Sequence, residues 1–122
     1  MIRFYNNSSA CLAISPLTTH CGHWTGLRKG AKTKTWFALP DEPLFAVAAL
    51  WRDTEEWGLA YTMVMTEACI HVADVHDRMP VILRRDDWQD WLDGAPDDAR
   101  ILCRPYPDLM VVNRTADRWN SR

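Results

Sequence analysis

The chain has 122 residues with 14 Lys and Arg against 16 Asp and Glu, so its net charge is −2. This length suits one domain with a real hydrophobic core, and the charge excludes a protein that is basic over its whole surface. Seven tryptophans are more than such a domain usually carries. Large rings can fill a core or provide stacking surfaces for bases and apolar ligands.

The first half of the chain contains one clear strand and one hairpin. Residues 1–10 carry little pattern, and residues 11–26 are rich in turn formers, so we expect irregular structure there. The segment 33–39 is typical of a strand. The apolar runs 44–51 and 59–66 predict two central strands that form an antiparallel hairpin around a polar turn.

The second half alternates short helices with extended segments. We predict a short helix in 67–76, an extended segment at 80–83, the clearest helix at 86–94 and a last strand at 108–112. An aspartate at the start of the clearest helix should cap it, and a glycine should end it. The apolar residues at helical spacing in that helix are Trp88, Trp91 and Leu92. The sum is an α+β fold built around a mainly antiparallel sheet.

The cysteines and the N-terminus bear on the cellular compartment. The four cysteines are scattered, and the first ten residues lack the apolar core of a signal peptide. No apolar stretch approaches the roughly 18 residues of a membrane helix. We therefore expect a cytoplasmic protein with reduced thiols, no membrane association, no metal and no cofactor.

A cluster of ionisable residues runs directly into an apolar segment that begins at Pro80. His76 lies there between Asp74, Asp77 and Arg78. A histidine in this setting can act as a general acid or base, because it changes charge near neutral pH. The alternative is a structural network in which Arg78 pairs with Asp74 or Asp77 and His76 ends a helix.

The segment "HCGH" at 20–23 gathers three groups that can bind metals or act as nucleophiles. Adjacent His20 and Cys21 point apart in an extended segment, and no second ligand pair has the usual spacing, so we do not predict zinc. Cys21 could serve as the nucleophile of a thiol hydrolase with His23 or His76 as its base. A buried, inert thiol is the alternative.

A local basic run follows this segment and favours a nucleic-acid partner despite the negative net charge. The run contains Arg28, Lys29, Lys32 and Lys34 and no acid. Such a strip can follow a phosphate backbone, and Trp24 just before it could stack on a base. The alternatives are a solvated basic loop and a tryptophan that closes the core.

Three blocks of this sequence resemble a known family. "PLFAVAALWRD", "YTMVMTEA" and "VHDRMPVILRRDDWQDWL" resemble, in the same order, the C-terminal half of the SOS-response-associated peptidase (SRAP) family. The clearest match covers residues 43–92, and "SPLTTHCGHWTGLRKGAKTKTWFAL" is more loosely similar to the preceding family segment. The resemblance implies processing of abasic sites in single-stranded DNA, and a chain that is a single partial SRAP-like domain over residues 1–122.

The resemblance also implies roles for particular residues. In the family, a cysteine after the initiator methionine captures the abasic aldehyde as a DNA–protein crosslink, while a glutamate beside a tryptophan and a histidine before Arg-Met-Pro assist proton transfer. The implied catalytic group is His76, Thr66 and His23. The implied DNA-binding group is Trp24, Arg28, Lys29, Lys32 and Arg78.

The sequence departs from the family pattern at three places. Ile2 stands where the nucleophilic cysteine is expected, the glutamate position holds His23 or Gly22, and the family's N-terminal half has no counterpart. We therefore expect an abasic-site processing protein with impaired peptidase-like or lyase-like chemistry. The alternative is a non-catalytic, single-stranded-DNA-binding or partner-dependent module. Open sheet edges would favour a homo-oligomer.

Overall fold

The structure, a computed structural model, describes most of the chain from Thr33 onward and three shorter strands before it. The described residues are 2–3, 10–14, 21–25, 33–40, 42 and 44–118. For the three strands before Thr33 and for Arg118, the backbone alone is described. These residues form short strands and two short helices, which confirms the predicted α+β class with antiparallel sheets.

The larger sheet has five antiparallel strands. Its order is β1-β2-β5-β6, and β9 pairs with β5 beside this path. The strands are β1 (Ile2–Arg3), β2 (Ala10–Ile14), β5 (Ala46–Thr54), β6 (Gly58–Met63) and β9 (Ile82–Leu83). Ala46, Ala48 and Ala49 of β5 are fully buried, which explains why this strand reads as a continuous apolar run.

A second sheet and a small ribbon complete the β structure. The second sheet has the order β10-β4-β3, and β7 pairs with β8, all antiparallel. These strands are β3 (Cys21–Thr25), β4 (Thr33–Ala38), β7 (Met65–Glu67), β8 (Arg78–Pro80) and β10 (Val111–Arg118). The helical elements are the 3-10 turn η1 (Arg85–Asp87), α1 (Trp88–Asp93) and α2 (Pro96–Leu102).

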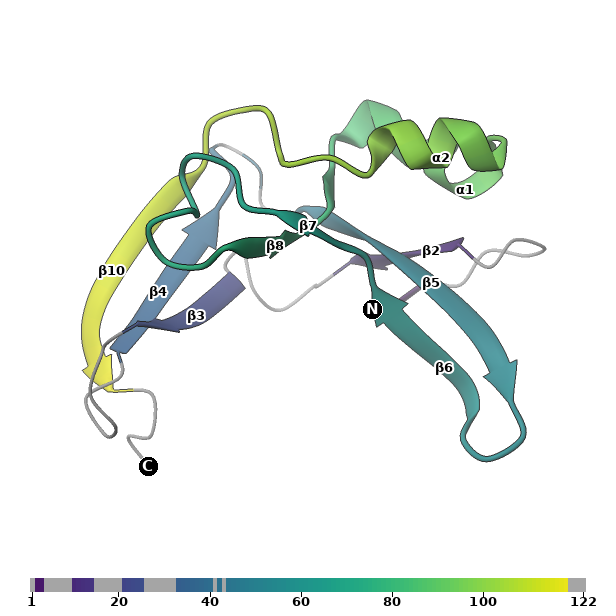
Figure 1. Cartoon of the computed structure of the whole chain (residues 1–122), viewed down its shortest axis with the longest axis horizontal. Helices are drawn as coiled ribbons and strands as arrows, with labels where there is room; N and C mark the ends of the chain where they lie inside the picture. Colours follow the sequence, from purple (N-terminus) through teal and green to yellow (C-terminus); the bar gives the residue numbers. More distant parts are fainter. Residues whose placement is uncertain are drawn as a thin grey trace.

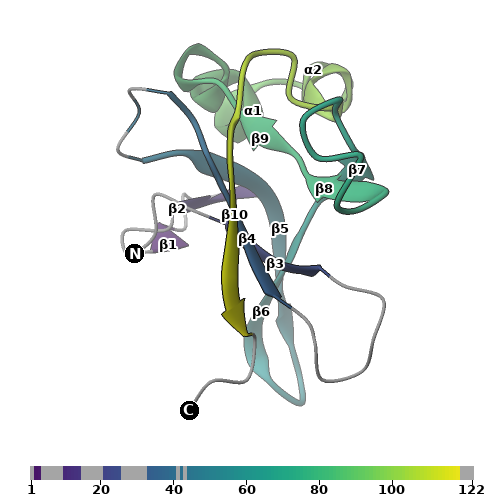
Figure 2. The same ribbon diagram turned by 90° about the vertical axis from the view of Figure 1, so that its left-hand side faces the viewer.

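The two sheets lie on opposite sides of the β7–β8 ribbon. In Figure 1 the β10-β4-β3 sheet occupies one side and the β5–β6 hairpin projects on the other, while α1 and α2 lie above the larger sheet. Figure 2 turns the molecule so that β10 and β4 face the viewer, with the β7–β8 ribbon set apart from them. Phe37 of β4, Val47 of β5 and Met79 of β8 belong to one core cluster, so the ribbon and both sheets meet in a common core.

A ring of backbone hydrogen bonds joins the ribbon to the larger sheet. The N–H of Ala48 donates to the carbonyl of Val81 at 2.8 Å, Val81 donates to Val64 at 2.9 Å, and Val64 donates to Ala48 at 2.9 Å. Val81 is fully buried. Each residue thus satisfies one donor and one acceptor in a place where an unpaired backbone group would be costly.

The core contains two clusters, and the ring residues Ala48 and Val81 belong to one of them. One contains Val81, Leu83 and Trp91, which pack under α1 and α2. The other gathers residues between the ribbon and the second sheet, among them Phe37, Met79 and Met110. The thiol of Cys69 lies 3.7 Å from the sulfur of Met110 in this second cluster, and Cys69 forms no disulfide.

The predicted strands were correct in part. The strand at 33–39, the hairpin and the extended segment at 80–83 are confirmed by β4, β5–β6 and β8–β9. The hairpin loop is shorter than predicted, because the strands continue to Thr54 and resume at Gly58. Irregular structure at 11–26 was wrong, since β2 and β3 lie there, and the last strand spans Val111–Arg118 instead of 108–112.

The prediction that 59–66 forms a central strand was wrong. Among the described residues, β6 is the terminal strand of its sheet, and most of its side chains are exposed. The apolar composition suggested burial, but the strand has a neighbour on one side only in the described part of the chain.

The prediction of a helix in 67–76 was also wrong. Turns replace it: Ala73 donates to the carbonyl of Cys69 and His76 to that of Val72, each at 3.0 Å, but these bonds are not consecutive. A helix needs successive bonds of this kind. The burial that motivated the prediction is present, because Val72 is buried and Val75 packs against the core.

The helix at 86–94 is confirmed as η1 followed by α1, with Trp91 buried. Its predicted aspartate cap is wrong, because Asp87 occupies the N-cap without a side-chain hydrogen bond. The sequence reading missed α2, which begins at Pro96, a favoured first residue of helices. The backbone N–H of Ala95 donates to the Asp98 carboxylate at 3.1 Å at this helix start.

Within the described residues, neither helix has the length and apolar composition needed to cross a membrane.

Candidate functional site

The segment before β8 places His76 at the end of a tightly bonded turn. The backbone N–H of His76 donates to the carbonyl of Val72, and the N–H of Ala68 donates to the carbonyl of Asp77, both at 3.0 Å. Val72 is buried and fixes the inner side of the turn to the core. The alternation of apolar and charged residues in "VADVHDRMP" therefore has a simple cause: the valines anchor the turn and the ionisable residues face outward.

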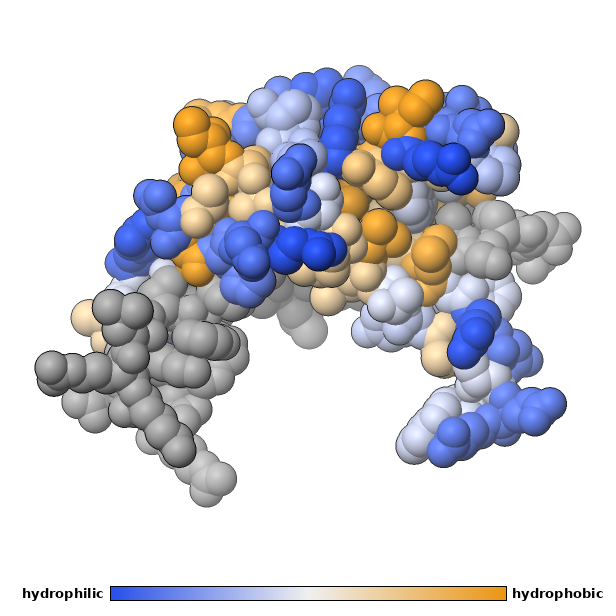
Figure 3. Space-filling view, in the orientation of Figure 1, coloured by the Kyte–Doolittle hydropathy of each residue, from blue (hydrophilic) through white to orange (hydrophobic). Residues whose placement is uncertain are grey.

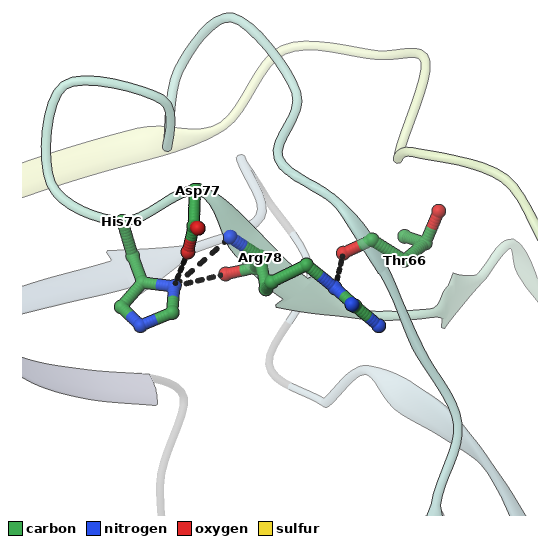
Figure 4. Close-up of polar contacts among 4 residues, drawn as sticks. All are labelled: Thr66, His76, Asp77 and Arg78. Atoms are coloured by element: carbon green, nitrogen blue, oxygen red, sulfur yellow. Dashed lines mark hydrogen bonds and ion pairs between the residues drawn. The ribbon is translucent and has the colours of Figure 1, made fainter.

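Three polar groups converge on one nitrogen of His76 (Figure 4). The backbone N–H of Arg78 donates to Nδ1 at 2.9 Å. The Arg78 carbonyl oxygen lies 3.0 Å from the same atom, and Oδ1 of Asp77 also lies 3.0 Å from it. Nδ1 thus has one donor and two acceptors within hydrogen-bond distance.

These partners can satisfy Nδ1 in either tautomer of the ring. When Nδ1 is unprotonated, it can accept the hydrogen bond of the Arg78 N–H. When Nδ1 is protonated, it can donate to the carbonyl of Arg78 or to the Asp77 carboxylate. The His76 side chain is 41% exposed, so the ring can be reached by solutes.

Arg78 joins the histidine to the neighbouring strand through its side chain. Its Nε donates to the carbonyl oxygen of Thr66 at 3.1 Å, and Thr66 lies opposite Met79 in the β7–β8 ribbon (Figure 4). The structural alternative had Arg78 paired with Asp74 or Asp77. Asp74 lies 3.7 Å from Arg114 of β10, and Asp77 lies 3.0 Å from Nδ1 of His76. Thr66, His76 and Arg78 are neighbours in the structure, and the contact to Thr66 is made through its backbone carbonyl, so the predicted roles of the three residues stay predictions.

The remaining predicted site residues lie on β3 or outside the described part of the chain. His23 is opposite Thr35 and Trp24 is opposite Lys34, so Trp24 belongs to a strand and the expectation of a loop aromatic was wrong. Only the backbone of β3 is described, so the roles of His23 and Trp24 stay predictions. The basic residues Arg28, Lys29 and Lys32 lie outside the described residues.

A second polar cluster was missed by the sequence reading. A pocket of about 310 Å³ lies between the start of β5 and η1, lined among others by Phe45, Arg84 and Tyr106. At its rim Arg84 donates two hydrogen bonds of 2.7 Å to the Asp108 carboxylate. These bonds lower the pKa of Asp108 and raise that of Arg84, while burial raises the pKa of Tyr106. Because Arg84 and Asp108 are 24 positions apart, no local motif could have predicted this pair.

No metal site is formed by the described residues, in which no three His, Cys, Asp or Glu side chains are close enough to hold an ion.

The fold and the polar cluster around His76 define a class of protein: an α+β domain of antiparallel sheets with a histidine in the turn before a strand of the β7–β8 ribbon. The model of one family, described as SOS response associated peptidase (SRAP), matches residues 23–121. The chain therefore belongs to the SRAP family, and the resemblance noted from three sequence blocks is confirmed.

Named relatives share about a third of the residues that can be aligned. The chain is 33% identical over 109 residues to the abasic site processing protein YoaM of Bacillus subtilis, covering 80% of this chain and 47% of that protein. It is 33% identical over 106 residues to the abasic site processing protein YoqW of Bacillus phage SPbeta, with 80% and 47% covered. The chain thus spans about half the length of these relatives.

Solved structures give the same picture. A protein from Bordetella bronchiseptica superposes with a TM-score of 0.73 and 27% identity, over 88% of this chain and 55% of its own. A protein from Bacteroides thetaiotaomicron has a TM-score of 0.72 over 88% of this chain and 49% of its own, and its 22% identity bears on the fold alone.

Proposed function

We propose that this chain takes part in abasic-site processing on single-stranded DNA. Its membership of the SRAP family and the names of its relatives support this role. The observation that carries the proposal is the convergence of three polar groups on Nδ1 of His76, within the block that most closely resembles the family. We further propose that residues 1–122 form one partial SRAP domain. Because the proposed substrate is DNA, we also propose that the protein acts in the cytoplasm.

His76 is the proton-transfer group in this proposal. Formation of an imine at an abasic aldehyde expels water, which needs a group that gives up a proton. Asp77 and the backbone of Arg78 supply partners for both protonation states of the ring, so the proton can move without leaving a polar group unpaired. Arg78 is a positioning residue, because its side chain reaches Thr66 of the neighbouring strand.

Single-stranded DNA is the proposed ligand of the basic run that follows β3. The run comprises Arg28, Lys29 and Lys32, and Trp24 in β3 provides a ring for base stacking. Binding of this kind releases counterions, so its affinity should fall steeply as salt rises. His23, opposite Thr35 of β4, takes the place where the family resemblance implies a glutamate.

The covalent step is the part of the family's chemistry that we expect to be impaired. An imidazole stands beside Trp24 where the resemblance implies a carboxylate. A non-catalytic DNA-binding module is the second candidate, and this substitution favours it. The two candidates differ in whether a covalent product forms.

The test mixes the chain with single-stranded DNA that carries one abasic site and resolves the products on denaturing and native gels. His76→Ala is compared with His71→Ala, a histidine of the same turn that serves as the matched control. A boiling-resistant band that weakens at least tenfold in His76→Ala, but not in His71→Ala, supports abasic-site processing with His76 in the proposed role.

The native gel decides between the remaining outcomes. Salt-sensitive binding without a covalent band supports the non-catalytic module. A covalent band of equal strength in both variants removes His76 from the mechanism. Absence of binding at 50 mM salt refutes a DNA-directed function for this chain.

A further inference from the structure

Arg114 of β10 contacts the turn that carries His76. Its Nη2 atom lies 3.7 Å from Oδ2 of Asp74, a residue of that turn. Val112, two residues earlier on β10, packs against the core cluster between the ribbon and the second sheet. Alternate residues of a strand share one face of the sheet. Arg114 therefore lies on the face of the second sheet that is turned toward the ribbon.

The ion pair between Arg114 and Asp74 is long and exposed. The two side chains are 59% and 83% exposed, and their separation of 3.7 Å exceeds the length of a hydrogen bond. Pairs of this kind contribute little to stability, because water and salt screen them. Arg84, by contrast, donates two hydrogen bonds of 2.7 Å to Asp108. The guanidinium of Arg114 can thus exchange its partner for a stronger anion at little cost.

Arg114 lies between the two parts of the proposed DNA surface, which are the cluster around His76 and the basic run. The basic run follows Thr25 of β3 and precedes Thr33 of β4, and these two residues are paired. Arg114 is opposite Thr35, which lies about 7 Å along β4 from Thr33. Figure 3 shows hydrophilic side chains on this side of the molecule, over the turn between β7 and β8 and beside β10.

We propose that Arg114 is a phosphate-binding residue of this surface, and that a phosphate of single-stranded DNA displaces Asp74 from it. The inference rests on the proposed function, since it names a further contact to the same substrate. A guanidinium presents two parallel N–H donors that match the oxygens of a phosphate. A phosphate bound there lies beside the turn of His76. Arg114 is therefore a positioning residue, which fixes the DNA backbone relative to the histidine.

The experiment measures binding of a fluorescently labelled single-stranded oligonucleotide by anisotropy, over a range of salt concentrations. One phosphate contact on a single strand releases about 0.7 counterion, which corresponds to roughly eightfold in the binding constant at 50 mM salt relative to 1 M. Arg114→Gln should therefore weaken binding by about eightfold at 50 mM salt and reduce the salt slope by about 0.7. Arg114→Lys keeps the charge and should retain most of the slope.

The exchange of partners predicts the opposite change at Asp74. Asp74→Asn releases Arg114 and should tighten binding by about two- to fivefold, the range of an exposed ion pair. In the Arg114→Gln background the same substitution should have a smaller effect, because the two residues are coupled. An equal gain in both backgrounds overturns the exchange, since Asp74 would then act on DNA through its own charge alone.

Arg100 and Asp97 of α2 provide the matched control. They form an ion pair of similar length and exposure, at 3.8 Å with side chains that are 82% and 89% exposed. α2 lies above the larger sheet (Figure 1), so Arg100→Gln should leave affinity and salt slope unchanged.

The outcomes separate this inference from the proposed function. If the parent chain binds DNA with a steep salt dependence and Arg114→Gln weakens binding no more than Arg100→Gln, the phosphate contact is refuted and the proposed function stands. If the parent chain does not bind DNA at 50 mM salt, both are refuted. A loss specific to Arg114→Gln, with the charge retained in Arg114→Lys restoring the slope, supports the contact.

Discussion

For the substitution Gly94→Ala, two physical effects predict changes of opposite sign in the free energy of unfolding. Gly94 follows α1 with φ −70° and ψ 167°, values that any residue can adopt. On backbone entropy alone, Gly94→Ala should stabilise the protein by about 0.4–1 kcal/mol. A Cβ built on Gly94, however, would lie 2.2 Å from the carbonyl oxygen of Asp90. The same oxygen accepts the Gly94 N–H at 2.9 Å.

The steric effect should be the larger. Observed Cβ contacts essentially never fall below 3.0 Å, so the end of α1 must open by most of an ångström. That movement weakens a hydrogen bond worth about 1 kcal/mol and adds about 1–3 kcal/mol of strain. Against the entropic gain of about 0.4–1 kcal/mol, we expect a net loss of about 1–3 kcal/mol in the free energy of unfolding.

Urea unfolding measured by tryptophan fluorescence is the assay. With a slope of about 2 kcal/mol per molar, the midpoint should fall by about 0.5–1.5 M at unchanged slope. Gly58→Ala is the comparison: its φ of 64° is strained for alanine, but no atom lies within 4 Å of the new Cβ, so it should cost about 1 kcal/mol through the backbone alone. An unchanged or higher midpoint for Gly94→Ala would refute the steric reasoning.

Three further predictions concern stability and reactivity. Asp108→Asn should lower the melting temperature at pH 7. The hydrogen bonds from Arg84 lower the pKa of Asp108 in the folded protein, so the difference in melting temperature should be fully present above the unfolded-state pKa of Asp108 and disappear as pH falls through its folded-state pKa. A series of melting curves at different pH would show this. Met79→Ala should cost about 2–5 kcal/mol in urea unfolding, since this side chain is 2% exposed, and a smaller loss would mean that the site collapses around it. In the folded protein a thiol reagent should label exposed Cys103 before buried Cys69, and equal rates would contradict the burial of Cys69. Because burial raises the pKa of Cys103, its labelling rate should continue to rise at pH values above the ordinary pKa of a thiol.

The sequence patterns predicted the parts of the fold that local chemistry decides. The apolar run of β5, the strand β4 and the helix α1 follow from periodicity and flanking turn residues. The helix expected in 67–76 failed because the apolar spacing of its valines serves a series of turns equally well. The central place expected for β6 failed because strand order depends on pairings that no single segment encodes.

The candidate site divides in the same way. His76 could be singled out because ionisable residues next to an apolar segment are chemically unusual, and its neighbours in sequence are also its neighbours in space. The link from Arg78 to the carbonyl of Thr66 could not be predicted, since it depends on the register of β7 and β8. The Arg84–Asp108 pair was missed for a similar reason, as it spans two helices and a loop.

The ring of hydrogen bonds among Ala48, Val64 and Val81 has a consequence for the order of folding. Its members come from three segments separated by 16 and 17 residues, and none of the three bonds joins neighbours in sequence. Such a ring closes late, after the hairpin has formed, because each closure costs loop entropy before it is rewarded. The turn that carries His76 lies between Val64 and Val81, and the β7–β8 ribbon closes it locally, so the ring joins this ribbon and its turn to the larger sheet. A chain that has folded only as far as its hairpin has therefore not yet fixed the turn of His76 against the larger sheet.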